Sequence, residues 1–194
     1  MRAPMTVLLL SPLGGGDMTR WCGGWALRLG ECVKVATSDW DSMSVAAVQR
    51  DGRACRDAVT KALATPGDVI LFPHSRGWVV AGEWLAVWSD LLSDEDAKRV
   101  RIVGTGNLER PRSGFVFRKG GRIGNSVRTT PEHTRFAILD IARKRDLWAI
   151  CPRLVFSFQL MLCAPHNDYS RVNPDALQPL SQQTVGLTRY VTVA

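Results

Sequence analysis

The sequence contains no long hydrophobic run. Of its 194 residues, 45% are hydrophobic and 22% are charged, a balance that is typical of a globular chain and argues against intrinsic disorder. The longest apolar run, at residues 7–10, is far too short to cross a membrane. The apolar stretch near the N-terminus is also too short for a secretion signal. We therefore expect a protein that is made in the cytoplasm without a signal peptide and has no transmembrane segment.

Cysteine is also scarce. The chain has five cysteines, an odd number, and no two of them have the CxxC spacing. This pattern excludes a zinc-finger type of site and a dense disulfide framework. We expect free thiols that are mostly buried, no metal and no cofactor.

The charge is basic but scattered. The formal net charge is +7, which suits an anionic partner or simply a solvated basic surface, and the sequence does not decide between them. No helix-turn-helix, zinc-finger or RNA-binding motif is present, so no specific nucleic-acid partner is expected. The glycines at 14–16 follow an apolar run but lack the spacing of a phosphate-binding loop, which argues against nucleotide binding.

The first half of the chain alternates between apolar runs and amphipathic segments. Short apolar runs predict strands at 6–10, 32–36, 68–72 and 101–105, and helical spacing predicts helices at 44–64 and 77–92, with 93–96 ending the second one. This alternation predicts an α/β fold with a central, mostly parallel sheet and helices on both faces.

The second half is less regular. Residues 107–130 are rich in Gly, Pro and Arg and predict an insertion outside the sheet, with a small hairpin formed by 115–117 and 122–123. We expect a further strand at 136–141, a helix at 155–163, and a terminal strand at 187–193, either at the edge of the sheet or docked elsewhere. No linker or repeat is visible, so residues 1–194 are expected to form a single domain.

A serine stands between a predicted buried strand and a predicted helix. The segment Phe72-Pro-His-Ser75-Arg-Gly77 resembles the G-x-S-x-G nucleophile elbow, with Gly77 at the second small position and Pro73 where the first glycine usually stands. In such an elbow the next backbone N–H, here that of Arg76, can donate to an oxyanion at the helix N-terminus. The alternative is an ordinary serine N-cap.

A nucleophilic serine needs a base and an orienting acid. In doubly wound hydrolases the order along the chain is serine, acid, histidine, which selects His166 from the three histidines. Asp146 follows the predicted strand 136–141, where such an acid belongs. Asp140 lies within that strand and Asp168 is only two residues from His166, so both are less suitable. His166 could also be an ordinary loop histidine.

Four segments in order resemble the PE-PPE-type serine hydrolases of mycobacteria, a cutinase-like branch of the α/β-hydrolases that also has relatives encoded by mycobacteriophages. The resemblance covers nearly the whole chain. It rests on the elbow at 72–85, on Gly-Asn107-Leu-Glu-Arg-Pro-Arg-Ser-Gly, on Asp146-Leu-Trp-Ala-Ile-Cys-Pro, and on His166-Asn-Asp-Tyr169 with Thr188-Arg-Tyr-Val near the end.

The resemblance implies a three-layer α/β-hydrolase fold and the catalytic triad Ser75, Asp146 and His166. It also implies an oxyanion hole formed by the backbone N–H groups of Arg76 and of the loop 11–16, taken as Gly14. Two aromatic residues, Trp78 and Trp148, are expected to border the substrate cleft, unless they only pack in the core.

Two functions follow as hypotheses. The first is a serine esterase or lipase that acts on lipid or cell-envelope esters, encoded by a mycobacteriophage or its host. The second is a catalytically weak or silent hydrolase fold that serves as a structural or envelope-binding component of a virion, such as a minor tail protein, with other virion proteins as partners. The order of the triad favours the first. Pro73 and the loss of an acidic family position at Ile150 favour the second.

Overall fold

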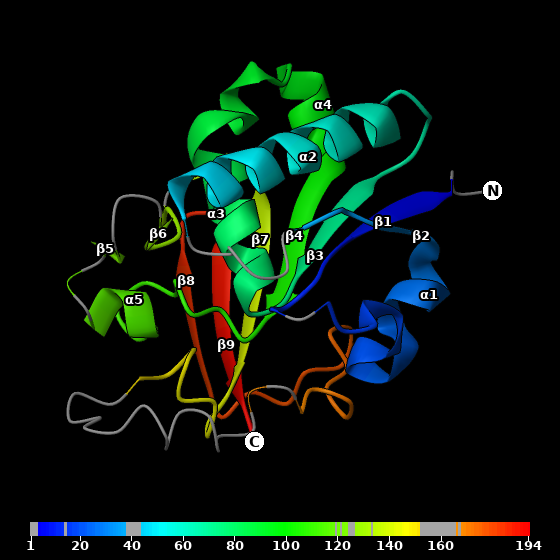
Figure 1. Cartoon of the computed structure of the whole chain (residues 1–194). Coiled ribbons are helices and arrows are strands. Elements are labelled where there is room, and N and C mark those ends of the chain that lie inside the picture. The colour runs from blue at the N-terminus through cyan, green and yellow to red at the C-terminus, as the bar shows by residue number, and fades with distance from the viewer. Residues whose placement is uncertain are drawn as a thin grey trace.

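Seven strands form one central sheet in the computed structural model (Figure 1). The order is β2-β1-β3-β4-β7-β9-β8, and every neighbouring pair is parallel except β8 and β9. The strands are β1 (Met5–Leu10), β2 (Gly30–Lys34), β3 (Val69–Pro73), β4 (Val100–Thr105), β7 (Ala137–Arg143), β8 (Ser181–Val185) and β9 (Thr188–Val193). The structure describes residues 4–13, 15–37, 44–118, 120, 122–123, 127–132, 134–151, 166 and 168–194.

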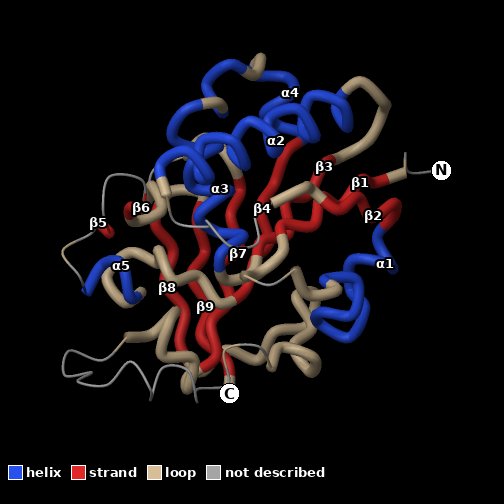
Figure 2. Tube along the Cα trace, in the orientation of Figure 1, coloured by secondary structure: helices blue, strands red, loops and turns tan. Residues whose placement is uncertain are grey.

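Helices cover both faces of this sheet (Figure 2). The helices α2 (Val45–Leu63), α3 (Arg76–Val87) and α4 (Asp94–Arg99) pack on one face, against every second residue of the strands, including Leu8 and Leu71. The short helix α1 (Trp25–Leu29) and the 3₁₀ segment η1 (Met18–Gly24) pack on the other face, against Val7 and Ile70. Successive residues of a strand point to opposite faces, so strands buried on both sides are apolar throughout. This is why the continuous apolar runs of the sequence predicted them correctly.

The winding of the chain reverses between β1 and β3. The strand that follows β1 along the chain, β2, pairs on one side of it, whereas β3 pairs on the other. The connections at such a point leave on opposite faces and open a crevice at the carboxyl ends of the strands, where ligands bind in open α/β sheets. The fold therefore places the loop after β1 and the turn after β3, which contains Ser75, at the expected ligand-binding edge.

Three sequence-based expectations need correction. Residues 115–117 form the helix α5 (Phe115–Arg118), and the hairpin pairs β5 (Arg122–Ile123) with β6 (Val127–Arg128) instead. The segment 93–96 does not end the second helix, because α3 already ends at Val87 and is followed by the 3₁₀ turn η2 (Ser89–Leu91). Residues 93–96 instead begin α4, whose N-cap Ser93 accepts from the Asp96 N–H at 3.0 Å. The last strand, β9, is not an edge strand, since β8 covers it. The helix expected at 155–163 lies outside the described residues.

The predicted fold class agrees with the structure, although β2 and α3 end at Lys34 and Val87, earlier than the expected 36 and 92. The insertion after β4 carries α5 and the β5–β6 hairpin outside the main sheet, so the predicted α/β class with a small insertion is confirmed. Within the described ranges, no helix is both long enough and apolar enough to span a bilayer. Cys22 and Cys55 are buried free thiols, and burial raises the pKa of the Cys22 thiol to about 12.

Candidate active site

Ser75 occupies a strained turn between β3 and α3. Its backbone has φ 51° and ψ −119°, a conformation that residues other than glycine rarely adopt. The turn is closed by two backbone hydrogen bonds, from Gly77 N–H to His74 O at 2.8 Å and from Trp78 N–H to Ser75 O at 2.9 Å. The Ser75 side chain makes no capping hydrogen bond to α3. The geometry therefore matches a nucleophile elbow and not the alternative of an ordinary N-cap.

Two glycines leave the room that the turn around Ser75 needs. A Cβ at Gly77 would lie 2.0 Å from the backbone oxygen of Leu10 in β1, so only glycine fits there. On the other side of the turn, a Cβ at Gly104 in β4 would lie 2.7 Å from Cγ of Pro73. Pro73 fills the position where an elbow usually has a glycine, and the missing side chain at Gly104 provides the room for its ring.

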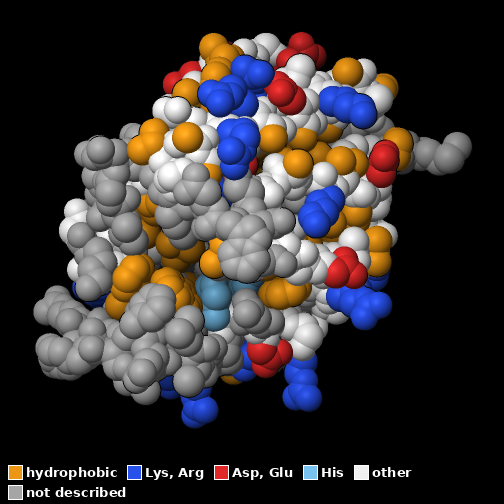
Figure 3. All heavy atoms as spheres, in the orientation of Figure 1, with side chains coloured by type: hydrophobic (Ala, Val, Ile, Leu, Met, Phe, Trp, Pro, Cys, Tyr) orange, Lys and Arg blue, Asp and Glu red, His pale blue; other side chains and the backbone are white. Residues whose placement is uncertain are grey.

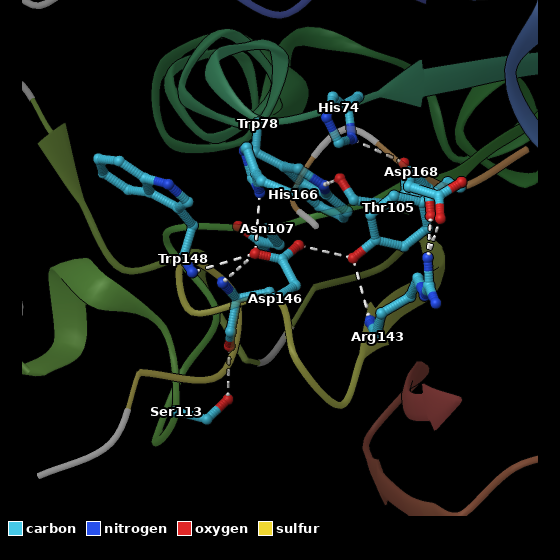
Figure 4. Close-up of polar contacts among 12 residues, drawn as sticks. His74, Trp78, Thr105, Asn107, Ser113, Arg143, Asp146, Trp148, His166 and Asp168 are labelled. Carbon is cyan, nitrogen blue, oxygen red and sulfur yellow. Dashed lines mark hydrogen bonds and ion pairs between the residues drawn. The ribbon is translucent and has the colours of Figure 1, made fainter. Parts of the chain in front are cut away.

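Asp146 and His166, which are 20 residues apart in the sequence, are in direct contact. The His166 Nδ1 lies 2.8 Å from Oδ1 of Asp146 (Figure 4). Asp146 follows β7 and is fully buried. Burial by itself raises the pKa of its carboxyl, but hydrogen bonds from His166, Tyr169 and a backbone N–H outweigh burial and lower the pKa below its ordinary value. Asp146 is therefore an ionised carboxylate near neutral pH.

This pair fixes the state of the His166 ring. An ionised carboxylate can only accept hydrogen bonds, so the Nδ1 atom of His166 carries the proton. In neutral His166 the Nε2 atom then has the free lone pair that a general base needs. The side chain is 12% exposed, and among the described residues Nε2 has no hydrogen-bond partner, Ser75 included. Such contacts are often long in unliganded enzymes.

The elbow and the His166 ring are adjacent. The ring of His74, which precedes Ser75, has its centroid 4.9 Å from that of His166. A Cβ at Gly106 would lie 2.7 Å from Cε1 of His74 and 3.1 Å from Cε1 of His166. The structure thus brings the turn that contains Ser75 beside the Asp146–His166 pair. Figure 3 shows histidine atoms at the surface between hydrophobic side chains. Of these two rings, that of His74 is fully buried and that of His166 is 12% exposed.

Four predicted site residues remain. Arg76 begins α3, which puts its backbone N–H at the helix N-terminus, and its buried side chain pairs with Asp51 at 2.7 Å. Trp148 is half-buried with its ring 5.9 Å from that of His166, as expected for a residue beside the site. Trp78 is fully buried in the core and donates to the Thr105 backbone oxygen at 3.0 Å, so it borders no open cleft in this structure. Gly14 lies outside the described residues.

Two residues near the site were not predicted from the sequence. His74 stands next to Ser75 in the sequence, and no pattern there predicts its contact with His166. Tyr169 donates to the second oxygen of Asp146 at 2.7 Å, and its fixed spacing of three residues after His166 was the available hint. Asp168, which lies next to Tyr169, forms an ion pair with Arg143.

The fold has a counterpart among solved structures. The structure is similar to that of a candidate YdeN-like hydrolase from Pectobacterium atrosepticum, with a TM-score of 0.50 and 16% identity over 98% of this chain and 77% of that chain. No protein-family model matches the sequence, and no curated protein matches it. At this level of identity the likeness is informative about the fold alone. The chain thus has an α/β fold similar to the fold of that structure.

Proposed function

We propose that this protein is a serine hydrolase that cleaves carboxylic esters with Ser75, His166 and Asp146. The observation that carries the proposal is the Asp146–His166 hydrogen bond of 2.8 Å beside a serine with φ 51°. A buried, ionised aspartate that orients a histidine, next to a strained serine turn, is the arrangement that nucleophilic acyl transfer needs. The hydrolase-type fold agrees with this assignment.

The reaction follows from the roles of the three side chains. His166 Nε2 takes the Ser75 proton as Oγ attacks the ester carbonyl carbon, and the carbonyl electrons move to oxygen. Asp146 stabilises the charged imidazole ring that results. The alcohol leaves with the proton from His166, and water then cleaves the acyl-serine by the reverse roles. The Arg76 backbone N–H and one from the loop 11–16 are proposed as oxyanion donors, each contributing about 3 kcal/mol in the transition state.

The surroundings of His166 favour an apolar acyl group. The rings of Trp148 and Phe115 lie 5.2 Å apart at one side of the site. The Trp148 ring also lies 5.9 Å from that of His166. Aromatic side chains that line a site are suited to lipid-like substrates. We therefore propose a lipid or cell-envelope ester as the substrate. A relationship to cutinase-like or phage-encoded hydrolases stays a prediction from the sequence resemblance.

Fluorophosphonate labelling read by mass spectrometry tests the proposal. We expect labelling at Ser75 that disappears in Ser75→Ala and falls strongly in His166→Ala and Asp146→Asn. The variant Ser170→Ala, which removes an exposed serine, serves as the matched control and keeps the label. Nitrophenyl esters of increasing chain length then define the acyl preference. A folded wild-type protein that takes no label would refute the enzyme proposal and favour the silent structural or envelope-binding role.

A further inference from the structure

We propose that Tyr169 is a positioning residue that holds Asp146 in place for His166. This inference rests on the proposed function and deepens it. The Tyr169 hydroxyl donates to Oδ2 of Asp146 at 2.7 Å and accepts the backbone N–H of Arg143 at 3.0 Å. The ring is fully buried among the residues on the α1 face of the sheet. Nothing in the assigned roles of Ser75, His166 and Asp146 requires this tyrosine.

The hydrogen bonds around Asp146 divide between its two oxygens. Oδ1 accepts from the backbone N–H groups of Trp148 at 3.0 Å and Ala149 at 3.3 Å, and from His166. Oδ2 accepts from Tyr169 (Figure 4 shows both sides of the carboxylate). Tyr169 is thus the described side chain that anchors the oxygen opposite His166, and it fixes the plane of the carboxylate. A planar carboxylate held at both ends keeps Oδ1 aimed at Nδ1.

The direction of the Tyr169 hydrogen bond is also determined. The Arg143 N–H can only donate, so it occupies a lone pair of the phenol oxygen and leaves the phenol proton for Asp146. Burial and the neighbouring Asp146 raise the pKa of Tyr169 well above its ordinary value of 10.0, so the hydroxyl stays protonated across the working pH range. Hydrogen bonds to charged acceptors are roughly twice as strong as neutral ones, which makes this contact suited to positioning.

The chain offers a matched pair of variants, because it contains two tyrosines. Tyr169→Phe removes the hydroxyl that contacts Asp146 and keeps the buried ring. Tyr190→Phe removes a buried hydroxyl that has no hydrogen-bond partner among the described residues. We expect kcat for a nitrophenyl ester to fall about tenfold in Tyr169→Phe, with KM little changed, and both values to stay near wild type in Tyr190→Phe. Equal kcat values in the two variants would overturn the proposal.

A proton NMR measurement separates positioning from a general loss of structure. The proton between His166 and Asp146 gives a far-downfield resonance, assigned by its absence in His166→Ala. Loss of the Tyr169 hydroxyl leaves more negative charge on Asp146, so this resonance should move further downfield in Tyr169→Phe and stay in place in Tyr190→Phe. Fluorotyrosine incorporated into the Tyr190→Phe protein makes the remaining phenol a stronger donor and should move it upfield. An unmoved resonance in both cases would refute the role of Tyr169.

The NMR result does not depend on turnover. If the wild type takes no fluorophosphonate label but the resonance still responds to Tyr169, the proposed function fails and the positioning contact stands. If the label is taken normally while neither kcat nor the resonance responds to Tyr169→Phe, the hydrolase proposal stands and the positioning role fails.

Discussion

Gly106→Ala should inactivate the protein while leaving it folded. Gly106 follows β4 and has φ +59°, and an added Cβ would lie 2.7 Å from Cε1 of His74 and 3.1 Å from Cε1 of His166. His74 would have to retreat by about 0.7 Å to restore an ordinary separation of 3.4 Å. The His74 ring packs 4.9 Å from the His166 ring, so the added Cβ displaces both rings. The His166 contact with Asp146 should then lengthen.

The magnitude follows from two separate effects. A non-glycine residue at positive φ costs about 1–2 kcal/mol, and overpacking a buried site adds about 1–3 kcal/mol. A domain with a stability of about 5–15 kcal/mol remains folded under such a loss. A displacement of 1 Å in a catalytic group costs about 100-fold in rate, so we expect hydrolysis and fluorophosphonate labelling to fall by about 10- to 100-fold.

Gly120→Ala provides the control for this prediction. Gly120 also has a positive φ, of +89°, but an added Cβ would meet no atom within 4 Å. Gly120→Ala should therefore have the backbone strain without the clash. We expect it to lose a little thermal stability and no activity. Thermal unfolding and labelling rates measured on both variants separate the two effects. If Gly106→Ala is as active as Gly120→Ala, then His74 and His166 do not pack closely against Gly106 as described.

Three further predictions concern the supports of the site. Gly104→Ala should destabilise the fold by about 1–3 kcal/mol, because the added Cβ would lie 2.5 Å from the buried Trp78 ring and 2.7 Å from the Pro73 ring; urea unfolding measures this, and an unchanged midpoint would contradict the packing described. Asp51→Ala should cost about 3–5 kcal/mol, because it removes the carboxylate that lies 2.7 Å from the buried guanidinium of Arg76; Asp57→Ala, an exposed site on the same helix, should cost far less. Because the pKa of Asp146 is lowered in the folded state, its carboxylate stabilises the protein above the ordinary aspartate pKa of 3.8, and this contribution is lost as the pH falls below that value. The stability of wild type relative to Asp146→Asn should therefore shrink as the pH falls from about 5 through 3.8 towards the lower pKa of the folded state, and a constant difference would argue against an ionised Asp146.

Local patterns were sufficient for the central strands and for the nucleophile candidate. The apolar runs that became β1, β3 and β4 predicted strands buried on both faces, and Ser75 stood directly between the run of β3 and the helical pattern of α3. These features depend on neighbours in the sequence. The same reasoning gave a wrong prediction for 115–117, because an alternation as short as Phe-Val-Phe fits a strand and a single helical turn equally well.

Chain order also selected Asp146 and His166, and the structure brings these two side chains together. The order of residues along the chain could not give the distance between the Asp146 and His166 side chains or the tautomer of His166. Both depend on how His166 packs against the turn after β7. It stays a prediction that Ser75 reacts with the help of His166. The acyl-accepting surface and the second oxyanion donor, in the loop 11–16, also stay predictions.

The sequence by itself determined the α/β pattern and the serine at a strand end, because both depend on short-range spacing, and the order of residues along the chain selected the three proposed catalytic residues. The tertiary structure alone decided that Gly104 makes room for Pro73, that His74 packs on His166, and that Tyr169 anchors Asp146. Each of these contacts joins segments that approach only when the strands align in the sheet. Their strength comes from burial and from a geometry that no local pattern specifies.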